Sequence, residues 1–433
     1  MIDLRPFRSR GFTHLAAATW VNEFGNWIGE IALAILVFDR TRSPLATATL
    51  FLSLRFLPAV LAPAVATRLE VLPTRFILGA LYLTEAALFA GLSLLTVHFS
   101  LPLVLALAAC DGVLAISSTA LSRSALVNSL TADGLLREGN ALVNLGTMIA
   151  IAGAPAIAGV VVATNGAAAA LRVDAATFVV TALIILTARG LSISFDPEAG
   201  FRERLRGGLG VLRTRPTVRR LLIAISLVVT MGSVALPIEV VFAKQTLHAG
   251  DSGYGILLTA WGAGMIVGGF VFATGRELRL MSVLGFSVLL IAIGYGGLAA
   301  APTLAVACVF SCVGGAGNSA AWVAAKTAMQ ERIPMTAQSP VMAVLEACNQ
   351  VMPALGFMIG GVITALSSPR AAYALSALGV AAVLAFFAIR PIDRVELSTA
   401  ATSTADNSPN EPIALQESGS PARTPTMPTP HTR

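Results

Sequence analysis

The sequence predicts an all-α integral membrane protein, with twelve transmembrane helices in two six-helix bundles. Three observations predict this fold class. Hydrophobic residues make up 56% of the 433-residue chain, and a mean hydropathy of +0.79 leaves too little polar surface to cover a soluble domain. Twelve apolar segments follow one another along the chain, each about as long as a spanning helix of about 20 residues. The basic residues alternate between the intervening loops as membrane topology requires.

The apolar segments form two sets of six on either side of a long polar interruption. The first set occupies residues 13–38, 45–67, 74–97, 101–121, 140–163 and 168–188. The second set occupies residues 219–243, 252–274, 280–300, 302–325, 338–366 and 370–389. The first segment follows three arginines in the manner of a signal peptide. It is too long, carries two glutamates and lacks a small-residue cleavage site, so we predict a retained first helix.

The positions of the basic residues predict the topology. Of the 29 Lys and Arg residues, 23 fall in termini and loops on the side of the N-terminus, and five fall on the other side. The remaining one, Arg55, lies inside a segment. Because positive loops stay in the cytoplasm, both termini are predicted to be cytoplasmic and the chain to lie in the inner (plasma) membrane.

Four regions follow from these patterns: an N-terminal bundle (1–188), a cytoplasmic basic linker (189–218), a C-terminal bundle (219–392) and a disordered cytoplasmic tail (393–433). Eight arginines crowd the stretch from 189 to 220. Apolar residues there recur at helical spacing, which predicts an amphipathic helix along the cytoplasmic membrane face. They are Phe201, Leu205, Leu209 and Leu212. The tail is rich in Ser, Thr and Pro and cannot bury enough surface to fold.

The two halves also resemble each other. Residues 122–160 and 324–362 run in parallel, with Arg123 matching Lys326 and Ala125 matching Ala328. A parallel repeat of six helices places the substrate path between the halves near the middle of the bilayer.

Three stretches carry a resemblance to a known family. They are FGNWIGEIALAILVFDRTRSP (24–44), LRFLPAVLAP (54–63) and FRERLRGGLGVLRTRPTVRRLLI (201–223). The chain resembles the major facilitator superfamily, in particular an exporter-like branch similar to macrolide efflux and enterobactin exporter proteins. The resemblance implies a transporter that works by alternating access.

Two signature motifs of that superfamily are present in altered form. The loop after the second segment keeps two basic residues but has Thr67 where the family has Asp, and the loop after the eighth keeps a Gly-Arg pair. The retained loop residues are Arg68, Arg75, Gly275 and Arg276. The fifth segment resembles the antiporter motif, whose small residues and proline seal one side of a transporter and favour export. The matching residues are Ala150, Ala154, Pro155, Ala158 and Gly159; ordinary helix packing is an equally good interpretation.

Charges inside the membrane are the strongest site candidates, because each costs several kcal/mol unless it is paired or hydrated. We predict a proton-coupling or substrate role for Glu30, Arg55 and Asp111; the alternative is a structural ion pair. Glu23, Asn26 and Trp27 on the first segment and Glu346, Asn349 and Gln350 on the eleventh are further candidates. Trp261 has two interpretations, stacking on a flat ligand or anchoring at the membrane interface, of which anchoring is the default for tryptophan. Glu85 is expected to pair with a neighbouring helix, and Glu239 to meet Lys244 at the surface.

No P-loop, nicotinamide fingerprint or nucleophile elbow is present in the sequence, and no metal-ligand spacing. We therefore expect no enzyme activity, metal or cofactor, and the proton gradient as the energy source. The predicted function is proton-coupled export of a small amphipathic molecule such as a drug, macrolide or siderophore. The alternatives are a non-transporting receptor or scaffold on the same fold, and an importer of a small metabolite. The expected partners are a small-molecule substrate and the lipid bilayer, with no nucleic acid, and the chain is expected to be a monomer.

Overall fold

The predicted apolar segments form helices. The computed structural model describes residues 4–59, 74–131, 134–188, 191, 201–274, 279–333 and 335–389. Within them, eleven helices are long and apolar enough to cross a membrane, and none of these residues forms a strand. The remaining predicted segment, 45–67, is second in chain order; it is described only as far as Ala59, where it forms a shorter apolar helix. The all-helical, membrane-spanning fold class is confirmed.

The first half begins with a short 3-10 turn, η1 (Arg5–Arg8). Short polar side chains fix where the next helices start: the hydroxyls of Ser9 and Ser43 accept hydrogen bonds from the backbone N–H groups three residues later. The elements are α1 (Arg10–Thr41), α2 (Pro44–Phe51), the π-helical turn η2 (Leu52–Phe56), α4 (Thr74–Leu94), α5 (Leu101–Thr131), α6 (Leu136–Asn165) and α7 (Ala167–Thr187).

The second half starts after the basic helix α8 (Phe201–Thr214). Its first span is interrupted near Pro237, whose missing N–H breaks the α-helical hydrogen bonds, so 216–246 divides into four pieces. These are α9 (Pro216–Ser233), the 3-10 turn η3 (Leu236–Ile238), α10 (Glu239–Val241) and the π-helical turn η4 (Phe242–Thr246). The remaining helices are α11 (Gly250–Thr274), α12 (Leu280–Ala300), α13 (Leu304–Glu331), α14 (Met335–Leu366) and α15 (Pro369–Ile389).

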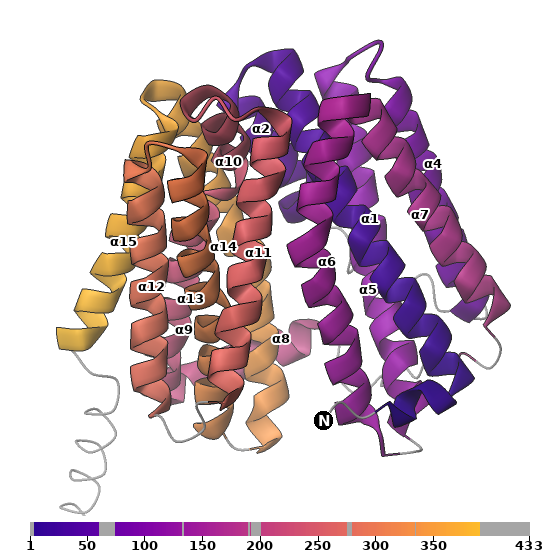
Figure 1. Cartoon of the computed structure of the whole chain (residues 1–433). Helices are drawn as coiled ribbons and strands as arrows, with labels where there is room; N and C mark the ends of the chain where they lie inside the picture. The colour runs from indigo at the N-terminus through magenta and orange to yellow at the C-terminus, as the bar shows by residue number, and fades with distance from the viewer. Residues whose placement is uncertain are drawn as a thin grey trace, which may run out of the picture. The chain divides into compact units, whose positions relative to one another are not determined.

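Helix packing groups the elements within each half (Figure 1). In the first half α1 packs between α6 and α7, and α4 covers the other side of α7. In the second half α13 packs between α11 and α12, while α15 packs on α12 and α9. Among the described residues the halves meet mainly along α6 with α11 and α2 with α14. The predicted boundaries at residues 188, 218 and 392 stay predictions, and the tail lies outside the described residues.

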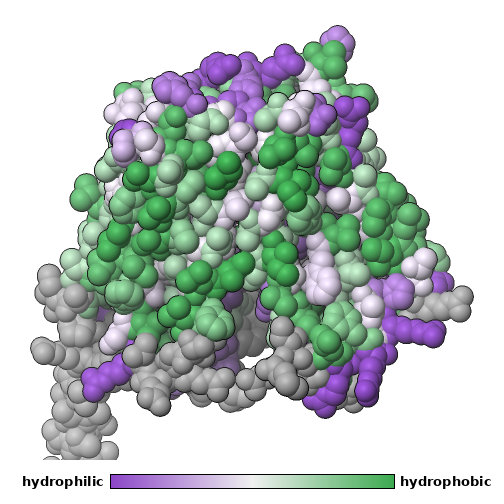
Figure 2. Space-filling view, viewed as in Figure 1, coloured by the Kyte–Doolittle hydropathy of each residue, from purple (hydrophilic) through white to green (hydrophobic). Residues whose placement is uncertain are grey.

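The surface of the helices is hydrophobic over a broad band. Figure 2 shows this band between hydrophilic residues at the two ends of the helices. Large apolar side chains stand exposed within the spans, among them Leu183 and Phe286. An exposed apolar surface of this extent is what contact with lipid requires.

The basic helix α8 differs in part from the expectation. It packs on α14, with Gly208 against Pro340. Leu212 is buried and Leu205 is partly buried in a cluster with α9, α13 and α14, whereas Leu209 is exposed. Of the four apolar residues predicted to contact the membrane, Leu205 and Leu212 are therefore covered by protein, because α14 lies close to them. The side chain of Phe201 lies outside the described ones.

Candidate functional site

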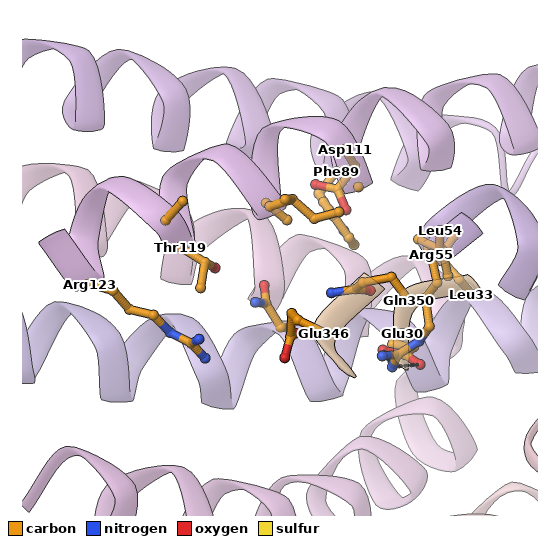
Figure 3. Close-up of a pocket in the computed structure, with 15 residues that line it drawn as sticks. Glu30, Leu33, Leu54, Arg55, Phe89, Asp111, Thr119, Arg123, Glu346 and Gln350 are labelled. Atoms are coloured by element: carbon orange, nitrogen blue, oxygen red, sulfur yellow. Dashed lines mark hydrogen bonds and ion pairs between the residues drawn. The ribbon is translucent and has the colours of Figure 1, made fainter. Parts of the chain in front are cut away.

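A cavity between the two halves collects most of the predicted site residues (Figure 3). Its volume is about 360 Å³, and α1, η2, α4, α5 and α14 line it. The lining includes the predicted residues Asn26, Glu30, Arg55, Asp111, Glu346 and Gln350. Glu23 and Asn349 lie outside the lining of this cavity.

An ion pair joins the first two helices inside the cavity. Nη2 of Arg55 donates to both carboxylate oxygens of Glu30, at 2.7 and 2.9 Å. The guanidinium side chain is 43% exposed and Glu30 22% exposed, which fits a water-accessible cavity rather than a dry interior. Contact with water lowers the cost of holding these charges inside a membrane protein.

Backbone geometry positions Arg55. The turn η2 is π-helical, so the N–H of Leu57 reaches the carbonyl of Leu52, five residues back. Such single π turns are frequent at functional sites. Next to it, α5 approaches so closely at Gly112 that an added Cβ would overlap the carbonyl of Leu54. Only glycine fits there, and the contact holds the turn that carries Arg55.

Asp111 faces the cavity from α5 and is only 7% exposed. Its Oδ1 atom has no hydrogen-bond partner among the described residues. Figure 3 places Asp111 beside Phe89, well separated from the Glu30–Arg55 pair. A buried carboxylate without a cation is costly, so this group is suited to take up a proton or a cationic ligand.

The second half contributes polar groups from α14. Glu346 and Gln350 point into the space between the Glu30–Arg55 pair and Arg123, which lies on α5 (Figure 3). The sequence explained Arg123 by topology alone. In the structure it lines the cavity, so the first cavity contains two arginines and three carboxyl groups.

Two more carboxyls lie buried outside the lining of the first cavity. Glu85 on α4 accepts a hydrogen bond from Ser118 at 3.3 Å, and Asp174 on α7 accepts one from Thr177 at 3.1 Å. Both are fully buried, and each has a second oxygen without a partner in the described part of the chain. Glu85 does bridge to a neighbouring helix, as expected. Asp174 was missed, although an acid inside the apolar segment 168–188 was a sufficient signal.

A second cavity of about 350 Å³ lies mainly against the second half. Aromatic side chains line it together with one carboxyl, Glu239, and the shared Arg55. The aromatic residues are Trp27, Trp261, Tyr295 and Phe357. Trp261 and Trp27 both line this cavity rather than only anchoring the chain at the membrane interface, and the substrate role of Trp27 stays a prediction.

The expected surface contact between Glu239 and Lys244 is wrong. Glu239 is 8% exposed, and its Oε2 has no hydrogen-bond partner in the resolved helices. Lys244 instead bridges the halves: its Nζ lies 2.6 Å from Oδ1 of Asp39 at the end of α1, and it also contacts Asp251 of α11. Lys244 lies five positions after Glu239, in the π turn η4 rather than in α10, so the two charges have different surroundings.

The small residues of the fifth segment form the contact between α6 and α11. Ala154, Pro155, Ala158 and Gly159 are buried. A Cβ added to Gly255 of α11 would stand 3.0 Å from the Cα of Gly159 and would overlap the carbonyl of Pro155. Ala150, one turn earlier, is also buried. The motif therefore lies at an interface between the halves. This position fits both interpretations of the motif, the sealing of one side of a transporter and ordinary helix packing.

The loop motif is described only in part. Arg75 lies 4.6 Å from the ring centroid of Phe76, in a cation–π contact. Arg68, Gly275 and Arg276 lie outside the described residues. Among the described side chains, no group of three or more His, Cys, Asp or Glu residues is arranged to hold a metal ion.

Comparisons with known proteins agree with this architecture. Residues 2–420 match the family model described as transmembrane secretion effector. A comparison with curated protein sequences found no match.

Solved transporter structures share the fold. The chain is similar to a point mutant of the nucleoside transporter NupG, with a TM-score of 0.74 and 11% identity over 88% of this chain and 100% of that one. It is also similar to a bacterial homologue of the iron transporter ferroportin. The inward-facing state gives a TM-score of 0.70 at 14% identity, covering 89% and 99% of the two chains. The outward-facing state gives 0.59 at 16% identity, covering 87% and 98%. Family and fold are those of membrane transporters and not of enzymes; the chain belongs to the transmembrane secretion effector family of the major facilitator superfamily.

Proposed function

We propose that this transporter exports a small amphipathic molecule, such as a drug, macrolide or siderophore, in exchange for protons. The observation that carries the proposal is the first cavity, where the Glu30–Arg55 pair and the unpaired, buried Asp111 lie between two repeated halves. Ionisable groups that are retained inside a membrane protein and reach a water-filled cavity are typical of proton-coupled transport. No bound cofactor is needed, since the proton gradient supplies the energy.

Alternating access fits the contacts between the halves. The Asp39–Lys244 pair and the contact of Gly361 with the start of α2 join the halves at the end where α1 finishes. With both termini cytoplasmic, as the distribution of arginines favours, this end faces away from the cytoplasm and the cavity opens inward. The higher TM-score to the inward-facing ferroportin homologue than to the outward-facing one supports the same assignment.

The coupling step uses the ion pair. While Glu30 is charged it holds Arg55 at 2.7 Å. A proton on Glu30 removes that attraction, and Arg55 is then free to turn to another carboxyl of the cavity. Asp111, which has no cation partner among the described residues, is a second proton-binding group. Loading and release of protons at these groups changes the relative stability of the two access states, which is what coupling requires.

We assign export rather than import on the fifth segment, whose Pro155 and small residues match the antiporter motif. They pack against α11, and in our proposal this contact is what seals one side. A receptor or scaffold has no reason to keep a hydrated ion pair and an uncompensated carboxyl in its centre. The protein is proposed to work as a monomer in the inner (plasma) membrane.

Inverted membrane vesicles test the proposal directly. A proton gradient, acid inside, is imposed, and the uptake of dyes, macrolides and siderophores is measured for wild type, Glu30→Gln and Asp111→Asn. Uptake of at least one compound is expected to depend on the gradient and to fall to the level of empty vesicles in both variants. Glu331→Gln, an exposed carboxyl at the end of α13, serves as the matched control. No gradient-dependent uptake of any compound contradicts the export proposal, and uptake that survives both substitutions contradicts the coupling residues.

A further inference from the structure

We propose that the second cavity is a binding site for organic cations, with the positive centre beside Glu239 and the apolar groups against Trp261, Tyr295 and Trp27. This inference rests on the proposed transport function and narrows its substrate class. It favours amine-bearing or quaternary cationic compounds and disfavours anionic ones such as deprotonated siderophores.

Charge is the first argument. The charged side chains in the lining of the second cavity are Arg55 and Glu239. Arg55 is already held by both oxygens of Glu30, so its charge is compensated. Glu239 has no such partner: its Oε2 accepts no hydrogen bond from the described residues, and the nearby Lys244 is held by Asp39 and Asp251. A cation is the ligand that compensates such a carboxylate, and an anion would add to the cost of burying it.

The aromatic wall is the second argument. The rings of Trp261 and Tyr295 stack with centroids 5.6 Å apart and an interplanar angle of 25°. Behind them, Tyr373 stacks on Tyr295 at 6.2 Å. The faces of Trp and Tyr rings attract cations, with Trp the strongest, and the attraction is larger where water is excluded.

This wall is fixed before any ligand arrives. The hydroxyl of Tyr295 donates a hydrogen bond to the carbonyl of Gly232 at 3.1 Å, which holds the ring in place. Next to Tyr295, Gly294 of α12 packs closely against Gly314 of α13: an added Cβ on Gly294 would stand 2.5 Å from the Cα of Gly314. A rigid aromatic surface binds with less loss of conformational entropy than a flexible one, so preorganisation favours affinity here.

The size and polarity of the second cavity are the third argument. At about 350 Å³ the cavity lies within the range of small-molecule sites, which are mostly apolar with a few placed polar groups. Ser233 and Asn318 are the uncharged polar side chains of this lining, and apart from Arg55 and Glu239 the rest is aromatic, aliphatic or small. One carboxylate among aromatic rings selects for charge and bulk rather than for a particular hydrogen-bonding pattern.

Binding to the full chain in lipid nanodiscs tests the site without any gradient. The probes are tetraphenylphosphonium and tetraphenylborate, which share a shape and carry opposite charges; empty nanodiscs correct for partition into lipid. Saturable binding is expected for the phosphonium alone. Glu239→Gln is expected to weaken it about tenfold or more, and Trp261→Leu about threefold to tenfold, in the range of a desolvated cation–π contact.

Control variants separate lost binding from lost folding. Glu239→Asp keeps the charge and is expected to keep most of the affinity, and Glu331→Gln removes an exposed carboxyl and is expected to change nothing. Equal binding of both probes, or phosphonium binding that Glu239→Gln leaves unchanged, overturns the inference. The second result is also the one expected if Glu239 only holds a proton.

The outcomes also separate this inference from the transport proposal. Binding of the phosphonium that depends on Glu239, without gradient-driven uptake of any compound, supports the site and counts against the transport proposal. Gradient-driven uptake of neutral or anionic compounds, without saturable phosphonium binding, supports the transport proposal and overturns the cation site.

Discussion

Asp39→Asn is the sharpest test of how the halves are held together. Lys244 contacts Asp39 of the first half and Asp251 of its own half. Only the first contact has to break when the halves separate at this end. The substitution therefore removes the part of the network that favours the closed arrangement and leaves the part within the second half in place.

The free-energy contribution of the Asp39–Lys244 pair follows from the exposure of the two side chains. Removing one partner of a fully buried ion pair costs about 3–5 kcal/mol. The side chain of Lys244 is 14% exposed but that of Asp39 is 36% exposed, so solvent screens the pair and we discount its contribution to about 1.4 kcal/mol. A change of this size shifts the ratio of closed to open molecules about tenfold.

Double electron–electron resonance spectroscopy measures the distribution of distances between two spin labels, and this distribution gives the ratio of closed to open molecules. Val97→Cys in the first half and Gln245→Cys in the second provide exposed attachment sites near this end, in a background without the four native cysteines. Asp39→Asn is expected to increase the population at long distance about tenfold. Asp251→Asn is the matched control, because it removes an equivalent carboxylate without weakening the contact between the halves. An unchanged distance distribution in Asp39→Asn, or an equal shift in the control, refutes the reasoning.

Three further predictions concern packing, the ion pair and the aromatic wall. Gly255→Ala is expected to lower the free energy of unfolding in mixed micelles by about 1–3 kcal/mol, since the added Cβ meets the backbone of α6. Gly153→Ala, where a Cβ meets nothing within 4 Å, is expected to be neutral or stabilising by up to about 1 kcal/mol, and equal losses contradict the packing argument. Arg55→Met is expected to abolish gradient-driven uptake in inverted vesicles while Arg55→Lys keeps part of it; full activity of the methionine variant excludes the ion pair from coupling. Tyr295→Phe removes the hydrogen bond to Gly232 and is expected to cost about 0.5–1.5 kcal/mol of stability and to weaken phosphonium binding only modestly, whereas complete loss of binding points to direct contact through the hydroxyl.

The fold was predictable because each span is a local signal. A run of about 20 apolar residues is sufficient to identify a spanning helix, and no knowledge of its neighbours is needed. The same holds for Glu30, Arg55 and Asp111, since a charge in an apolar run is visible in the sequence alone. Even so, only the structure shows that the first two are paired and that the third is not.

The remaining features depend on contacts between distant segments. Asp39 and Lys244 are 205 residues apart, and no local pattern relates them. Whether Glu239 faces solvent or protein depends on how α10 turns after the break near Pro237, which a count of apolar residues does not determine. Trp261 illustrates the same limit: tryptophan at an interface and tryptophan in a cavity look alike until the helix facing it is known.

The two π turns determine the direction in which the later side chains of their helices face. Each of η2 and η4 holds one residue more than the same stretch of α-helix would, and each carries a cation that binds a carboxylate of α1. Deleting one residue from Leu52–Phe56 would restore α-helical hydrogen bonds and rotate every later side chain of that helix by about 100°. A single-residue gap in an alignment of relatives at either turn therefore marks a chain whose Arg55 or Lys244 counterpart faces in a different direction.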